Sequence, residues 1–167
     1  MSKKIILNLA ISIDGYIASE DGGFEWIVGD GDKSLDTEKK WDFNGFLDTI
    51  DVVVMGKNCY DQNFHKDFKN KKVYVATSKD LKDYENIHFI KGDIVKKIEK
   101  NIFLFGGGKA IDPFIKANII DEYIIGIIPT ILGKGRKLFL ENNPKIDLHL
   151  DEYITDEGVV ILRYSKR

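Results

Sequence analysis

The feature that most constrains the fold of this chain is a series of short apolar runs, several of them continuously apolar and rich in Val and Ile. Runs of this kind are typical of strands that are covered on both faces. The runs that we expect to form strands are residues 4–12, 51–56, 72–77, 87–90, 101–105, 121–128, 146–153 and 158–164. The sequence therefore predicts a sheet of about eight strands.

Segments with a helical spacing of apolar residues lie between several of these runs, at residues 37–50, 93–100 and 109–118. Strands that alternate with helices predict an α/β fold with a mainly parallel sheet. After residue 120 the strands follow one another with no room for a helix, so we expect the last ones to be antiparallel and to form an edge of the sheet. The turn "TDEG" at 155–158 favours a hairpin there.

Composition and charge exclude several classes of function. The 167 residues carry a net charge of −2, with 25 Lys and Arg spread along the chain, which argues against nucleic acid and anionic membranes as partners. No apolar run reaches the length of a membrane span. Cys59 is the only cysteine, and His65, His88 and His149 lie too far apart for a familiar zinc spacing. We expect a single cytoplasmic domain over residues 1–167, without a metal.

The stretch "FLFGGGKAID" at residues 103–112 combines a buried strand, three glycines and the start of a helix. The N–H groups and dipole of a helix N-terminus favour a phosphate, and glycines allow a ligand to come close to the backbone. A turn that needs positive φ is the alternative explanation. Three glycines in a row between a strand and a helix favour ligand binding, although the spacing is neither that of a G-x-G-x-x-G fingerprint nor that of a P-loop.

Two further strands end in groups that can receive a phosphate. They are the strands of "VVVMGKNCYD" (52–61) and "VYVATSKD" (73–80). Each end taken singly is also explained as a helix cap. Because ligands of open α/β sheets bind at the carboxyl ends of the strands, the three ends together predict a dinucleotide that lies along this edge. The residues expected to face it from these two strands are Lys57, Asn58, Thr77, Ser78 and Lys79.

The segment "IFLFGGGKAIDPFIKANIIDEYIIGIIPTILGKGRKLF" (102–139) closely resembles the C-terminal half of the riboflavin-biosynthesis reductase domain, the RibD C-terminal domain. That family belongs to the dihydrofolate reductase superfamily. "SIDGYIA" (12–18), followed by Trp26, is similar to the family's S-x-D-G-x-x-A and W stretch, and "VVVMGKNCYD" to its G-[RK]-x-T-Y stretch. The resemblance covers most of the chain. It implies a dihydrofolate reductase-like three-layer sandwich with a mostly parallel sheet of about eight strands and an antiparallel C-terminal edge.

The resemblance also implies the cofactor, NADPH. In the family the glycine turn approaches the pyrophosphate, often through a cis Gly–Gly peptide, and the end of the third strand receives the adenosine 2′-phosphate, which favours NADPH over NADH. Ala10 and Ile17 match positions that flank the nicotinamide. The cofactor-binding residues implied in this way are Ala10, Ile17, Gly56, Lys57, Asn58, Thr77, Ser78, Lys79, Gly106, Gly107, Gly108, Lys109 and Ala110.

For the substrate side, the resemblance points to Asn8 and to Trp26, which either closes over the nicotinamide or anchors its loop. Asp36 and Glu38 are the candidate proton donors, at the start of the helix expected over 37–50. Acidic residues in the first turn of a helix are equally explained by capping and by the helix dipole. The resemblance further implies a homodimer, with "LGKGRKLF" (132–139) either ordering a loop at the interface or forming a solvated basic turn.

The predicted function is a stand-alone NADPH-dependent reductase that transfers hydride to a small heterocyclic substrate, pteridine- or pyrimidine-like. Tyr16 stands where the riboflavin enzymes usually have Arg, and Lys71 lies near the place of the Arg that grips folate. A 5-amino-6-(5-phosphoribosylamino)uracil reductase of the riboflavin pathway and a true dihydrofolate reductase stay open as alternatives. So do a nucleotide-binding protein without turnover and a structural homodimer.

Overall fold

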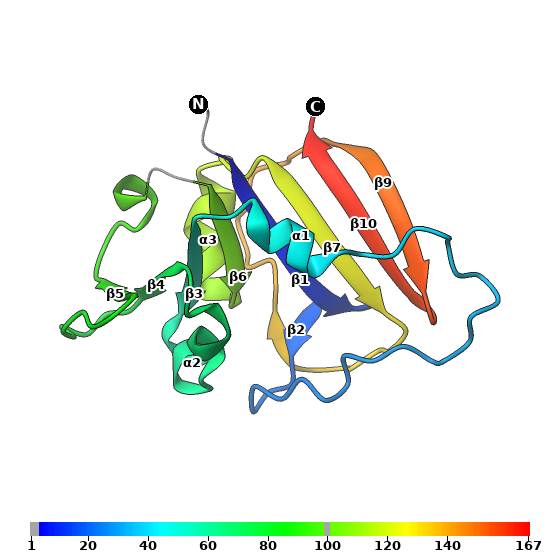
Figure 1. The fold of residues 1–167 in the computed structure, drawn as a ribbon, viewed down its shortest axis with the longest axis horizontal. Helices are drawn as coiled ribbons and strands as arrows, with labels where there is room; N and C mark the ends of the chain where they lie inside the picture. The colour runs from blue at the N-terminus through cyan, green and yellow to red at the C-terminus, as the bar shows by residue number, and fades with distance from the viewer. Residues whose placement is uncertain (1–3, 99–100) are drawn as a thin grey trace.

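The computed structural model describes residues 4–98 and 101–167 (Figure 1). As far as residue 128, its strands are interspersed with short helices, and after that residue only strands follow. In chain order they are β1 (Ile5–Ser12), β2 (Tyr16–Ala18), α1 (Phe43–Asp48), β3 (Val52–Gly56), α2 (Lys57–Asp61), the 3-10 helix η1 (Phe64–Phe68), β4 (Lys72–Ala76), β5 (Ile87–Ile90), the 3-10 helix η2 (Val95–Lys97), β6 (Ile102–Gly106), α3 (Gly108–Lys116), β7 (Glu122–Ile128), β8 (Arg136–Lys137), β9 (Leu148–Asp156) and β10 (Val159–Lys166).

Eight of the strands form one sheet in the order β5-β4-β3-β6-β1-β7-β10-β9. The pairs from β5 to β7 are parallel, and β10 pairs antiparallel with both β7 and β9. Each strand predicted from an apolar run is present in it. The hairpin between β9 and β10 turns at Glu157 and Gly158, whose φ angles of 51° and 87° suit a tight two-residue connection. The mostly parallel sheet with an antiparallel C-terminal edge is thereby confirmed.

The sheet has a hydrophobic core on each face. On one face, Leu7 and Leu104 pack with Ile111 and Phe114 of α3. On the other, Ile6 and Phe103 pack in a cluster that includes Phe46 of α1. Because neighbouring residues of a strand point to opposite faces, the continuously apolar strands supply both cores at once. The result is three layers, with α3 behind the sheet and α1 in front of it in Figure 1.

The helix predicted over 37–50 is much shorter in the structure, where α1 begins at Phe43. Asp42 caps it, its carboxylate accepting a hydrogen bond from the N–H of Gly45 at 3.0 Å. The preceding residues instead lie along the edge of β9, where the N–H of Thr37 donates to the Thr155 carbonyl at 3.0 Å. Tertiary hydrogen bonds therefore override the local helical pattern of this segment.

Two other elements differ from the prediction. The segment 93–100 forms only the short η2, and its last two residues lie outside the described residues. The small sheet of β2 and β8 was not predicted, since both strands are too short to give a hydrophobic period. Among the helices that the structure describes, none is both long and apolar enough to cross a membrane.

Candidate active site

One pocket of about 1070 Å³ runs along the carboxyl ends of β3, β4, β5 and β6 and along β1. The parallel strands end on the same side of the sheet, which brings residues far apart in the chain to one edge. Every residue predicted to bind the cofactor lines this pocket, as does Asn8. The cofactor set is Ala10, Ile17, Gly56, Lys57, Asn58, Thr77, Ser78, Lys79, Gly106, Gly107, Gly108, Lys109 and Ala110.

The glycine turn between β6 and α3 forms part of the pocket wall. Gly106 has a φ of 144°, a conformation that side chains rarely adopt, and the peptide bond between Gly106 and Gly107 is cis. A β-carbon on Gly107 would meet nothing closer than the Cδ1 atom of Ile17, at 3.6 Å. The protein itself therefore leaves room for a side chain at Gly107, and the space beside it belongs to the pocket.

The first turn of α3 presents free backbone donors to this pocket. The N–H groups of Ala110 and Ile111 both donate to the Gly107 carbonyl, at 3.0 and 3.1 Å. The N–H groups of Gly108 and Lys109 have no acceptor in residues 4–98 or 101–167, and both residues line the pocket. Unpaired N–H groups at a helix start favour an anionic ligand.

The charges that line the pocket are all positive. They belong to Lys57, Lys79, Lys109, Arg136 and Lys137. No Asp, Glu or His is among the pocket residues in the described part of the chain, although the whole chain carries a net charge of −2. The local field of the pocket therefore attracts anions, despite an overall charge of the opposite sign.

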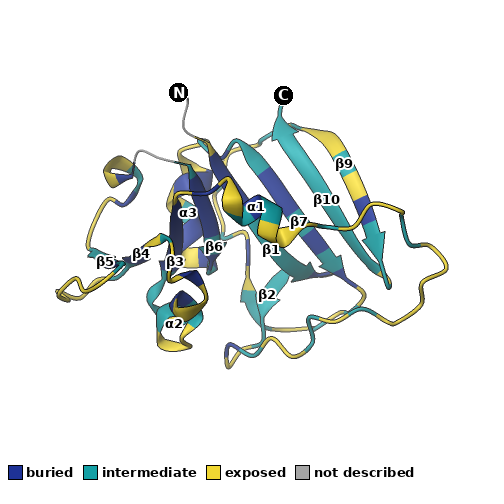
Figure 2. Cartoon of the chain, viewed as in Figure 1, coloured by how far each residue is buried: buried dark blue, intermediate teal, exposed yellow. Residues whose placement is uncertain are grey.

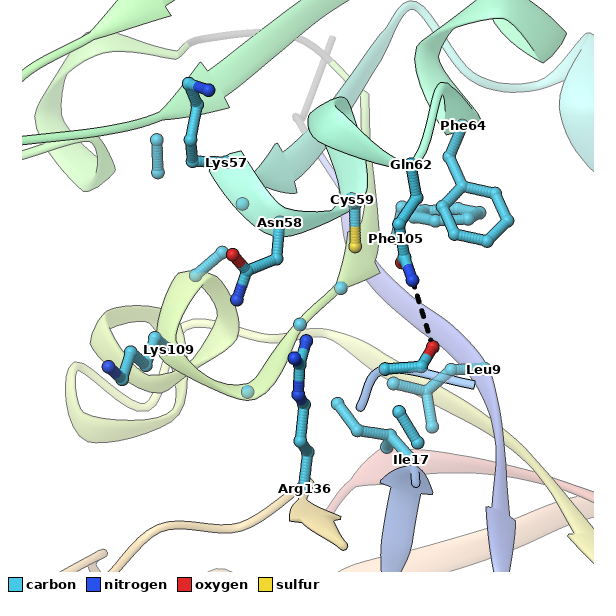
Figure 3. Close-up of a pocket in the computed structure, with 18 of the residues that line it drawn as sticks. Leu9, Ile17, Lys57, Asn58, Cys59, Gln62, Phe64, Phe105, Lys109 and Arg136 are labelled. Atoms are coloured by element: carbon cyan, nitrogen blue, oxygen red, sulfur yellow. Dashed lines mark hydrogen bonds between the residues drawn. The ribbon is translucent and has the colours of Figure 1, made fainter. Parts of the chain in front are cut away.

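Arg136 and Lys137 were missed as site residues by the sequence analysis, which treated 132–139 as an interface loop or a solvated turn. The strand β8 pairs with β2, and Gly135 lies so close to it that a β-carbon there would be 2.3 Å from the Ala18 carbonyl oxygen. Figure 3 shows Arg136 reaching from β8 across the pocket toward the glycine turn. Its guanidinium makes no hydrogen bond or ion pair with any of the described residues.

The loop that carries β8 is held in place by Asp14. Its carboxylate accepts hydrogen bonds from the Ser12 hydroxyl at 2.6 Å and from the backbone N–H groups of Leu132 and Gly133 at 3.2 and 2.8 Å. The Ser12 hydroxyl contributes most to lowering the pKa of Asp14, and these N–H groups lower it further. Asp14 is thus the anchor of this loop, in line with a turn residue rather than a catalyst.

The end of the pocket near β1 is walled by aromatic rings. Phe24 and Phe105 each lie 5.2 Å from Phe64 between ring centroids. Asn8 lines the same pocket, and its Nδ2 atom is buried without a hydrogen-bond partner in the described residues. A buried amide without a partner costs free energy that a bound ligand can recover. This end suits a flat, ring-shaped molecule with polar atoms at its edge.

Cys59 also borders the glycine turn, with its Sγ atom 4.0 Å from the position of a β-carbon on Gly106. Burial raises the pKa of the Cys59 thiol to about 11, and the nearby Arg136 offsets this only in part. The thiol is therefore protonated at neutral pH and a poor nucleophile, as expected of a small buried side chain.

The structure does not bring the predicted acids to the pocket. Asp36 accepts a hydrogen bond from the N–H of Glu157 at 2.7 Å and pairs with Lys40 at 2.9 Å, and Glu38 lies in the same loop. The expectation that they begin a pocket-lining helix is wrong, because this loop runs along β9. Trp26 does not line the pocket either. Its Nε1 donates a hydrogen bond to the Gly23 carbonyl of its own loop at 3.1 Å. Phe24 of the same loop does.

Comparison with known proteins gives a consistent picture. The family described as "RibD C-terminal domain" matches residues 71–162. The uncharacterized protein YwjB of Bacillus subtilis (strain 168) is 32% identical over 165 residues, which cover 90% of each chain. The crystal structure of a proposed riboflavin biosynthesis protein from Shewanella sp. PV-4 has a TM-score of 0.80 at 26% identity and covers 100% of this chain and 99% of its own.

A more distant likeness concerns the fold alone. Dihydrofolate reductase from Enterococcus faecalis, complexed with NADP(H), has a TM-score of 0.61 at 16% identity over 98% of this chain and 96% of its own. The expected dihydrofolate reductase-like α/β fold is therefore confirmed. Because the family match spans more than half of the chain and YwjB exceeds 30% identity along most of it, the chain belongs to the RibD C-terminal domain family.

Proposed function

We propose that this protein is an NADPH-dependent reductase that transfers hydride to a small, flat heterocyclic substrate, pteridine- or pyrimidine-like. The observation that carries the proposal is the lining of the pocket. Among the described residues it has five cationic side chains and no acidic one, and the backbone of its glycines is accessible to a ligand. The fold of the family, which is that of reductases, supports the same class of activity.

The middle of the pocket fits a pyrophosphate. Free N–H groups of Gly108 and Lys109 lie on one side, and the Arg136 guanidinium reaches in from β8. Charge-assisted hydrogen bonds of this kind are about twice as strong as neutral ones. NADPH would supply the hydride at its nicotinamide ring, and the chain's own residues would hold and orient the two reactants.

The far end of the pocket favours NADPH over NADH. Thr77, Ser78 and Lys79 follow the end of β4, and Lys57 lies at the start of α2, where it pairs with Asp61. Hydroxyls and ammonium groups at one site can hold the extra phosphate on the adenosine ribose, which NADH lacks. The N–H of Lys79 donates to the Thr77 hydroxyl at 3.1 Å, which helps to hold the shape of this turn.

The substrate would occupy the aromatic end, between Phe24, Phe64 and Phe105 and against the amide of Asn8. A carboxamide offers an NH2 group as donor and a carbonyl oxygen as acceptor, so it can pair with a neutral edge of a heterocycle. With no acidic group or imidazole among the described pocket residues, we propose that the proton that accompanies the hydride comes from water.

The first test is a thermal shift of the purified protein with NADPH and with NADH at the same concentration, about 100 times the Kd for NADPH, where a single site adds roughly 2.7 kcal/mol of stability. For a domain of this size that is a rise of several degrees, and we expect it to be larger with NADPH. No shift with either dinucleotide would overturn the proposal. A panel of oxidised pteridines and pyrimidines, followed through loss of the reduced-nicotinamide absorbance, then separates a reductase from a protein that binds the nucleotide without turnover.

A further inference from the structure

We propose that the substrate of this site is a heterocycle that carries no phosphate or carboxylate group. This inference rests on the proposed function and narrows it. A 5-amino-6-(5-phosphoribosylamino)uracil carries a phosphate and folate carries carboxylates, so we expect neither to be the substrate. The reason is the distribution of charge along the pocket, whose cations lie where the cofactor is expected and whose aromatic end is apolar.

Three of the five pocket cations can be placed relative to the aromatic end in one view. Figure 3 shows Lys57 and Lys109 at its left and Arg136 at its centre, reaching toward the glycine turn. Phe64 and Phe105 lie at its right, on the other side of Arg136 from the two lysines. Positive charge therefore decreases along the pocket toward the aromatic end.

The other two pocket cations also lie near the expected position of the cofactor. Lys79 follows the end of β4, and the carbonyl of Lys137 adjoins Gly108 in the first turn of α3. Lys57 pairs with Asp61, which leaves four pocket cations without an ion pair among the described residues. The pyrophosphate and the 2′-phosphate of NADPH together carry about four negative charges at neutral pH. With the cofactor bound, no unpaired pocket cation is left for an anionic substrate.

Asn8, at the aromatic end, lies among apolar side chains. Its cross-strand neighbour is Ile124, which belongs to the core cluster against which Phe105 packs. Figure 2 shows the buried residues along β7, the strand of Ile124. Arg163 on β10 is the next residue across the sheet, but its guanidinium pairs with Glu122 at 2.9 Å. An anionic group here would lose its hydration without gaining a cation, and the negative faces of aromatic rings would repel it.

Three further residues near this end supply no cation to the pocket. Lys71 donates to the Ile50 carbonyl at 2.7 Å and does not line the pocket. Lys66, two residues after Phe64 in η1, does not line it either. Tyr16 stands where the riboflavin enzymes usually have Arg, and a tyrosine cannot provide a positive charge. The candidate contacts for a phosphate or for the folate carboxylates are therefore not found in the described part of the pocket.

The amide of Asn8 suits an uncharged ring instead. Its Nδ2 atom has no hydrogen-bond partner among the described residues, so no bond to this atom fixes which end of the amide faces a ligand. The last torsion of an asparagine side chain is broad and roughly two-fold, so a ligand can select either the donor or the acceptor. The neutral edge of a pterin or a pyrimidine offers both, and the phenylalanine rings can cover its faces.

The test compares two probes that differ by one carboxylate. Pterin is uncharged at slightly acidic pH, and pterin-6-carboxylate is the same ring with an anionic group. Each is titrated through its own fluorescence with protein saturated with NADP+, which cannot donate hydride. We expect pterin to bind at least about tenfold more tightly than pterin-6-carboxylate. Equal or tighter binding of the carboxylate would overturn the inference, and so would a failure of pterin, lumazine and uracil all to bind.

Gln62→Lys should change this preference. Gln62 is exposed at the end of α2 and lines the pocket, and its Nε2 donates to the Gly22 carbonyl at 3.0 Å, a bond that an ammonium group can also make. A cation there should raise the affinity for pterin-6-carboxylate at least about fivefold. The matched control is Asn70→Lys, which adds the same charge at an exposed position outside the pocket and should leave both affinities unchanged. If Gln62→Lys bound the carboxylate no better than the wild type, the missing cation would not be what excludes it.

The proposed function can fail separately from this inference. If NADPH raises the melting temperature but the carboxylated ring is preferred, the inference is wrong and the proposed function stands. If neither NADPH nor NADH binds, the proposed function is wrong, and the inference about its substrate falls with it.

Discussion

Gly108 packs directly on Lys137: a β-carbon at Gly108 would lie 2.5 Å from the Lys137 carbonyl oxygen. This contact joins the start of α3 to β8, and through β8 to β2. At Gly107, one residue earlier, the nearest atom to a β-carbon is 3.6 Å away. Two neighbouring positions of one turn therefore require glycine for different reasons. At Gly108 the backbone of β8 occupies the space of a side chain, and at Gly107 that space belongs to the pocket.

Stability distinguishes the two glycines. Gly108→Ala should lower the free energy of unfolding by about 1–3 kcal/mol, because the rigid backbone of β8 must move to admit the methyl group. Gly107→Ala should change it by much less, since its φ of −88° is open to any residue. Urea denaturation followed by fluorescence measures both. Equal losses for the two variants would contradict this assignment.

For NADPH binding, we expect Gly107 to be important, although its replacement has little effect on stability. Gly107→Ala places a methyl group in the pocket and should weaken NADPH binding at least about tenfold, measured by fluorescence titration. The matched control is Gly126→Ala on β7, where a β-carbon would meet Ile161 at an ordinary 3.8 Å and which does not line the pocket. NADPH affinity should be unchanged in the control. If Gly107→Ala bound NADPH as tightly as the wild type, the conclusion that the glycine turn contacts NADPH would be wrong.

Arg136 should strengthen NADPH binding through its unpaired guanidinium. Arg136→Gln is expected to lower the affinity roughly tenfold and to weaken its dependence on salt, as the loss of a charge-assisted contact requires. Adenosine 2′-monophosphate, which has no pyrophosphate, should bind the variant and the wild type alike. Lys134→Gln, on a side chain 76% exposed and outside the pocket, is the control. Equal NADPH affinity in Arg136→Gln and wild type would refute the role of Arg136.

Asp36 should affect how the stability of the protein depends on pH, and it should not affect NADPH affinity. The N–H of Glu157 and, next, Lys40 hold the pKa of Asp36 below its ordinary value of 3.8. A lowered pKa in the folded state gives stability that is present above pH 3.8 and is lost as the pH falls through the folded value. The melting temperature of Asp36→Asn should therefore lie below that of the wild type at pH 6, and the gap should shrink below pH 4. Neither Asp36→Asn nor Glu38→Gln should alter NADPH affinity.

Cys59 should resist alkylation in the folded protein. With a pKa of about 11, roughly a thousandth of the thiol is ionised at pH 8. We expect iodoacetamide to label it far more slowly than it labels the same cysteine after unfolding in guanidinium chloride. Because Cys59 lines the pocket, NADPH should slow the reaction further. Labelling of the native protein at the rate of the unfolded one would show that the thiol is neither buried nor neutral.

The sequence by itself determined the strands and the edge at which they converge. A run such as 51–56 is apolar on both faces, and only a central strand of a layered sheet buries both. The role of the three glycines from the end of β6 to the start of α3 could be predicted for a similar reason, because a strand, a glycine turn and a helix start form one continuous local unit. Every residue assigned to the cofactor from such strand ends and from the family resemblance lines the pocket.

Only the tertiary structure decided which residues complete the pocket and which leave it. Asp36 does not begin the helix predicted over 37–50, because it accepts a hydrogen bond from the β9–β10 turn. The strand β8 brings Arg136 to the glycine turn, and it is too short to give a hydrophobic period in the sequence. Local patterns report what a segment can form with its own neighbours in the chain. Glu157, which donates to Asp36, and β2, which positions Arg136 by pairing with β8, are far away in sequence. The positions of Asp36 and Arg136 therefore depend on contacts that exist only once the sheets are assembled.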